Sequence, residues 1–139
     1  MDSEPLYHDI TPHERALLSR LRFRPEAFLG ACSLRNFRQM SNGYQFAMLT
    51  AGLRDRHNLL PEGLREFTAQ YLNISPGTQD WFTMLSEREP DDAKALTLFF
   101  RVLDAFLEAN GLEPLVRVDN WEGFRSLWTE EITYQEAVE

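Results

Sequence analysis

The chain has 139 residues, of which 43% are hydrophobic and 12% aromatic, and its formal net charge is −8. This length fits a single domain, 1–139, that folds without a disulfide or structural metal, and the aromatic content excludes an intrinsically disordered chain. Cys32 is the only cysteine, so an internal disulfide and a thiolate zinc site are excluded.

The N-terminus, Met1 to Pro5, is acidic and polar, without the positive start and apolar run of a signal peptide. The longest apolar cluster, 95–107, is interrupted by Thr97, Arg101 and Asp104 and is too short to cross a membrane. We therefore expect a soluble protein of the reducing cytoplasm, with no membrane partner.

Charge is unevenly divided along the chain. Residues 1–60 carry a net charge of +2, whereas residues 61–139 carry −10. Such an acidic second half repels phosphates, which disfavours nucleic acid, and it attracts a basic protein. The alternative interpretation is that the acidic surface only maintains solubility.

After an N-terminal extension, 1–10, the sequence predicts a helix from Pro12 to about Phe23. Thr11 is the expected cap, and Glu14 is expected to reach back to the Thr11 amide. Pro25 ends this helix, and residues 24–30 form either a turn or one short helical turn that Gly30 closes.

Ser33 is the expected cap of a second long helix, which we predict over 34–54. The residues that share one face of this helix at helical spacing are Phe37, Met40, Tyr44, Ala47 and Ala51. Gly43 lies beside that face, where a missing side chain would allow close helix packing.

Pro61 is predicted to open a third helix that ends at Asn73, and Trp81, Met84 and Leu85 indicate a short fourth one. A longer helix is predicted from about 91 to Asn110, with Gly111 as its stop. Because this helix is the longest and most apolar, we expect it at the centre of the fold.

Residues 114–118 are compatible with one short strand, and a last helix starts at Asp119 or Asn120 and carries Trp121, Phe124 and Trp128. Residues 129–139 form an acidic C-terminal tail. The predicted fold is all-α, a single compact orthogonal bundle of about six helices.

Catalytic chemistry is not evident in the sequence. His8 and His13 are five residues apart, off the spacing that places two metal ligands on one helix face. Pairing of Cys32 with His57 requires the fold to bring them together. There is no phosphate-binding glycine loop and no nucleophile elbow. We therefore predict no enzyme, no catalytic residue, no metal and no cofactor.

Several short motifs lie between residues 24 and 100. They are Arg24-Pro25, Phe28-Leu29-Gly30, Ser33-Leu34, Gly43-Tyr44, Phe67, Trp81 and Phe99-Phe100. This arrangement resembles a functionally uncharacterised bacterial family whose members lie near polymorphic toxin genes. The resemblance covers about residues 17–109 and implies an immunity or antitoxin-like role.

The sequence thus favours a protein-binding module, an immunity-type protein that neutralises a basic toxin domain by covering its functional surface. The expected partner-binding residues are acidic or aromatic. They are Glu87, Glu89, Asp91, Asp92, Trp121, Glu122 and Trp128. The alternatives are a regulatory adaptor, which could be a homodimer, and a small enzyme or ligand-binding domain with a pocket near Cys32 and His57.

Overall fold

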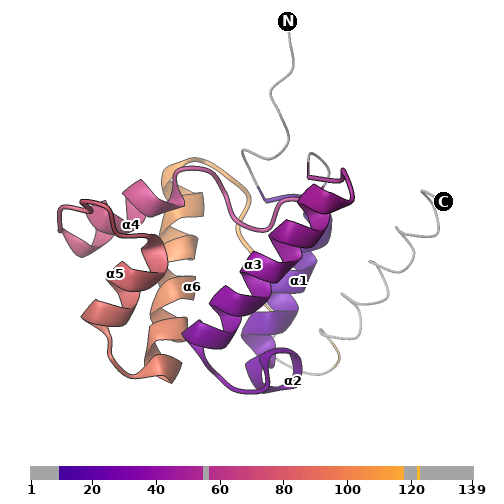
Figure 1. Ribbon diagram of the computed structural model, residues 1–139, viewed down its shortest axis with the longest axis horizontal. Helices are drawn as coiled ribbons and strands as arrows, with labels where there is room; N and C mark the ends of the chain where they lie inside the picture. Colours follow the sequence, from indigo (N-terminus) through magenta and orange to yellow (C-terminus); the bar gives the residue numbers. More distant parts are fainter. Residues whose placement is uncertain (1–9, 55–56, 118–121, 123–139) are drawn as a thin grey trace, which may run out of the picture.

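The computed structural model describes residues 10–54, 57–117 and 122, and in this part of the chain it contains six helices and no strand (Figure 1). The helices are α1 (Pro12–Phe23), α2 (Pro25–Leu29), α3 (Leu34–Thr50), α4 (Leu64–Leu72), α5 (Trp81–Arg88) and α6 (Asp92–Ala109). The predicted all-α bundle is therefore confirmed. No described helix is long and apolar enough to cross a lipid bilayer.

Helix α6 forms the centre of the bundle, as its apolar sequence predicts. It packs against α3, α4 and α5, and Figure 1 shows it between the α4–α5 pair and the α1–α3 group. Its side chains Phe99, Leu103 and Leu107 are almost completely buried. The aromatic ring of Phe99 lies 4.7 Å from that of Phe37 on α3 and 5.2 Å from that of Trp81 on α5. These ring contacts join three helices in one core.

Helix α3 ends at Thr50, four residues earlier than the sequence predicts. Gly52 adopts a positive φ of 75°, and the Leu53 amide donates to the Met48 carbonyl at 2.9 Å. This is the arrangement of a Schellman motif, in which a glycine in the left-handed region ends a helix. The predicted range, 34–54, includes Gly52 and is therefore four residues too long.

Helix α4 begins at Leu64 rather than at Pro61. Gly63, with a φ of 91°, is the residue that precedes the helix, so residues 61–63 form a turn. A residue with a positive φ cannot itself be part of a right-handed α-helix, so the helix starts after Gly63. The predicted end at Asn73 is confirmed, since Asn73 has a φ of 59°.

The predicted strand is wrong over the residues that the structure describes. Residues 114–117 form no hydrogen-bonded ladder, and Val118 lies outside the described residues. An extended segment needs a neighbouring strand to pair its backbone groups, and the described elements are all helices. Leu115 nonetheless packs into the core and is only 4% exposed.

No other helix of the described chain packs closely against Gly43. It lies within α3, and a side-chain carbon built at this position meets no atom within 4 Å. We therefore expect Gly43→Ala to raise the free energy of unfolding by up to about 1 kcal/mol, because alanine restricts the unfolded chain and favours helix. Chemical denaturation measures the change. An unchanged or lower stability would contradict the open position of Gly43.

Candidate functional site

An exposed apolar surface lies on the C-terminal half of α3. Phe46 is 69% exposed and Leu49 is 56% exposed. The exposed residues beside them are smaller, and we call the whole set the α3 face. It consists of Gly43, Phe46, Ala47, Leu49 and Thr50. Residues three and four apart lie together on a helix surface, so these side chains form one continuous strip.

The other exposed large hydrophobic residues of the described chain are isolated or less exposed. Phe28 and Val116 stand alone, and Tyr71 and Ile74, three residues apart at the end of α4, are only 40% and 38% exposed. Single exposed hydrophobic side chains are normal in soluble proteins, whereas clusters mark surfaces that bind something. Phe46 and Leu49, three residues apart on one helix, are such a cluster.

The predicted core face of α3 is correct only in its first half. Phe37 is buried and Met40 and Tyr44 are half-buried, but Ala47 and Ala51 are exposed. The α3 face does not follow from the single apolar row that runs from Phe37 to Ala51. The signal was present, since Phe46 and Leu49 are apolar residues that do not belong to that row.

A buried polar cluster holds the C-terminal half of α3 against α1. At its centre is Glu14 of α1, whose side chain is fully buried. Its carboxylate accepts hydrogen bonds from the hydroxyl groups of Thr11 and Tyr44, and His57 Nδ1 donates to Glu14 Oε2 at 2.8 Å. The backbone amide of Asn58 also donates to the Thr11 hydroxyl, at 3.0 Å. The cluster therefore joins α1, α3 and the segment after α3.

The predicted capping role of Glu14 is wrong, because Glu14 and Thr11 bind other groups in this buried cluster. The Thr11 amide donates to the carbonyl of Asn58 at 3.1 Å, not to Glu14, and the Thr11 side chain does not cap α1. Both capping groups are used in contacts between segments that are more than 40 residues apart. Such contacts override the local capping preference.

Cys32 and His57 do not form a common site. Cys32 precedes the first residue of α3 and His57 follows its last turn, so the helix separates them by roughly 25 Å at 1.5 Å per residue. The alternative of a pocket shared by Cys32 and His57 is therefore contradicted, and the cavity that Cys32 lines does not include His57. The rings of His13 and His57 contact each other edge to face, with their centroids 5.4 Å apart. No group of three or more metal-binding side chains occurs in the described part of the chain. His8 lies outside it.

Two of the predicted acidic anchors have structural contacts. Asp91 caps α6, accepting a hydrogen bond from the Lys94 amide at 3.0 Å. Asp92 accepts from the Arg35 amide at 3.1 Å and from the Ser33 hydroxyl, so it joins the starts of α3 and α6. Replacing either residue would change the fold's stability as well as its charge.

The other two acidic anchors of this group lie near the C-terminal end of α5. Glu87 is exposed and accepts a hydrogen bond from Gln79 Nε2 at 3.0 Å. Glu89 is half-buried and accepts from the Asp91 amide at 3.4 Å. Of the four, Glu87 contributes least to holding the fold together, so it is the best position for a test of charge.

The remaining predicted anchors lie at the C-terminal end of the chain. Trp121 and Trp128 lie outside the described residues, and Glu122 is exposed. Residues 118–139 contain six acidic residues and one arginine, a net charge of −5. Half of the negative charge of the second half of the chain thus belongs to this segment.

Asp80 connects the start of α5 to α3. Its carboxylate caps α5 by accepting from the Thr83 amide at 2.8 Å and lies 3.7 Å from Arg38 of α3. Burial acts to raise the pKa of Asp80, but the hydrogen bonds from Thr83 and the charge of Arg38 outweigh it, so the pKa is lowered from 3.8. The ionised carboxylate therefore stabilises the folded chain.

We expect Asp80→Asn to lower the free energy of unfolding at pH 7 by less than about 1 kcal/mol, because asparagine keeps the cap and loses the charge. A carboxyl with a depressed folded pKa contributes stability above its unfolded pKa and loses it as pH falls. The difference between wild type and variant should therefore shrink below about pH 4. Denaturation curves across pH measure it, and a difference that grows in acid would contradict the assignment.

Comparison of the chain with protein-family models, curated proteins and solved structures gave no match. Its function is therefore inferred from its geometry, its charge and the resemblance of its sequence motifs.

Proposed function

We propose that this chain is a protein-binding module of the immunity type, which neutralises a basic toxin domain by covering the toxin's functional surface. The observation that carries the proposal is the α3 face, where Phe46 and Leu49 expose most of their apolar surface on one helix. The resemblance of the sequence motifs to a bacterial family near toxin genes supports the same role.

An exposed helical strip of this kind is a recurring mode of recognition, in which apolar residues three and four apart enter a groove or pack on a second helix. Burying Phe46 and Leu49 against a partner would contribute about 2 kcal/mol each. Large apolar residues of this kind act as anchors at the centre of an interface, and the small residues Gly43 and Ala47 permit a close approach.

Electrostatic attraction supports the choice of a basic partner. The net charge of −8 speeds the association of a cationic domain, and the effect weakens as salt is added. The α3 face itself carries no charged residue. It therefore corresponds to the apolar centre of an interface.

Co-expression with the product of the neighbouring gene tests this role. The wild-type chain should restore growth to cells that express the toxic partner, and the double variant Phe46→Glu, Leu49→Glu should fail to do so. Val116→Glu is the matched control, because Val116 has the same exposed fraction as Leu49, 56%, and lies away from α3. Rescue by the double variant at equal protein levels would contradict the proposal.

A second candidate is the homodimeric adaptor, which the exposed Gly43 and Ala47 beside Phe46 favour because small residues allow two helices to pack closely. Sedimentation of the purified chain separates the two functions. A dimer that dissociates on Phe46→Glu would assign the α3 face to self-association, and a monomer leaves it available for a different protein.

A further inference from the structure

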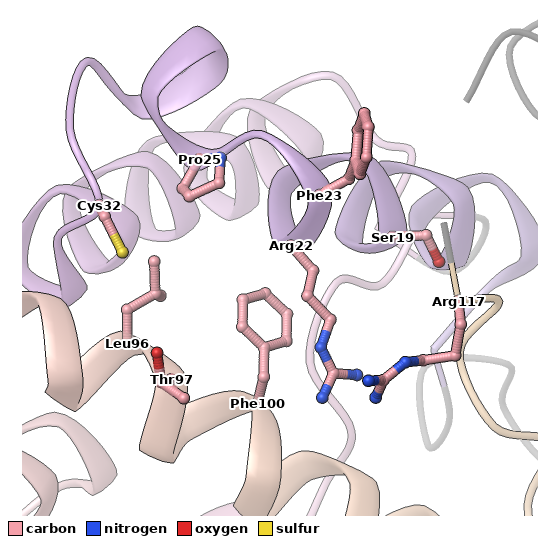
Figure 2. Close-up of a pocket in the computed structure, with 9 residues that line it drawn as sticks. All are labelled: Ser19, Arg22, Phe23, Pro25, Cys32, Leu96, Thr97, Phe100 and Arg117. Atoms are coloured by element: carbon pink, nitrogen blue, oxygen red, sulfur yellow. The ribbon is translucent and has the colours of Figure 1, made fainter. Parts of the chain in front are cut away.

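A cavity of about 440 Å³ lies between α1 and α6, and the segment between α2 and α3 forms one end of it (Figure 2). Pro25, Leu96 and Phe100 provide apolar walls. The volume lies within the range of small-molecule sites in proteins, which combine apolar walls with a few polar groups. The charged groups of this cavity, Arg22 and Arg117, are gathered at its other end.

That end is positively charged. The guanidinium group of Arg22 forms two hydrogen bonds with the Asp104 carboxylate, at 3.0 and 2.7 Å, and Arg117 Nη1 lies 3.9 Å from the same carboxylate. Figure 2 shows the two guanidinium groups next to each other. Two cations thus share one anion, and Arg117, whose side chain is 66% exposed, retains donors for a second carboxylate.

Ser19 adds an unsatisfied hydroxyl to this wall. The residue is 1% exposed, lines the cavity, and its Oγ has no hydrogen-bond partner among the described residues. Ser19 and Arg22 are three residues apart on α1, so they lie on the same face of the helix. A buried hydroxyl without a partner lowers stability, and this Oγ lies behind the cavity wall rather than open to the cavity.

The opposite end rejects negative charge. The Cys32 thiol donates to the Ala93 carbonyl at 3.7 Å. Burial, followed by the charges of Glu26, Asp92 and Asp91, raises the pKa of this thiol. Cys32 is therefore a neutral, weakly polar group at neutral pH, and the nearby carboxylates would repel an anion from it.

We propose that this cavity binds a small carboxylic acid, with its carboxylate at Arg117 and Arg22 and an aromatic or branched apolar group between Phe100, Leu96 and Pro25. The site lies on α1 and α6 and does not include the α3 face. Ligand binding here and protein binding at the α3 face are thus separate properties, and each can fail without the other.

A second cavity provides a competing position. It has a volume of about 480 Å³ and is lined by Arg88, Lys94 and Arg101, but Glu89 lies among these cations and offsets their charge. Arg101 on α6 and Arg117, which follows α6, are both exposed. Arg101→Gln therefore serves as a control, because it removes one exposed arginine that does not line the first cavity.

Titration of the full chain with phenylacetate, followed by NMR, tests the proposal. We expect shifts of Leu96, Thr97 and the Phe100 amide signals. Arg117→Gln should weaken the binding at least tenfold, and Arg101→Gln should leave it unchanged. Phenylacetamide, which has the same shape without the charge, should bind at least tenfold more weakly.

Three outcomes would overturn the site: no shift at the highest soluble concentration of phenylacetate, shifts confined to the cavity around Arg101, or equal affinities for wild type and Arg117→Gln. Since Arg117 is largely exposed, its replacement leaves the fold intact, and the circular dichroism spectrum of the variant verifies this.

Discussion

Replacing Glu14 by alanine is expected to lower the free energy of unfolding by about 3 kcal/mol, because the change leaves Thr11, Tyr44 and His57 without their common acceptor in a buried site. The loss of side-chain volume adds to the cost. Urea denaturation followed by circular dichroism measures this difference.

Glu26→Ala is the matched control, since Glu26 is an exposed glutamate on α2 and its replacement should change stability by no more than about 0.5 kcal/mol. Tyr44→Phe removes one of the three hydrogen bonds and should cost about 1 kcal/mol. A loss of less than 1 kcal/mol for Glu14→Ala would mean that the buried cluster does not hold α3 against α1.

Replacing Phe46 by alanine is expected to weaken partner binding about 30-fold or more, the effect of losing an interface anchor worth at least 2 kcal/mol. The stability of the free chain should change little, since the Phe46 side chain is 69% exposed. Titration calorimetry with the purified partner measures the dissociation constant.

Val116→Ala is the control for that experiment and should leave the dissociation constant within twofold of wild type. Glu87→Lys tests the separate electrostatic contribution, which should lower the association rate at low salt and lose its effect at high salt. Equal affinities of wild type and Phe46→Ala would remove the α3 face from the interface.

The helical fold was predictable because its signals are local. Proline starts α1 and α2, Ser33 caps α3, and the apolar face of α6 continues over five turns. These features depend on residues within one or two turns of each other, so the sequence contains them directly. The misplaced end of α3 and the misplaced start of α4 result from Gly52 and Gly63, whose left-handed conformation has no unique sequence signature.

The candidate site was less predictable because its causes are distant in sequence. Glu14 fits a capping box by spacing, yet its partners are Tyr44 and His57, which only the fold brings near. Asp92 resembles a solvated helix start but binds Ser33 and Arg35. The exposure of Phe46 follows from where the bundle ends, which helical periodicity does not reveal.

Hydrogen–deuterium exchange of the chain with and without its partner tests the central proposal most directly. We expect complex formation to slow exchange in the C-terminal half of α3, residues 43–50, where the exposed Phe46 and Leu49 would become covered. Slower exchange confined to other helices, with no change in residues 43–50, would contradict the assignment of the α3 face as the binding surface.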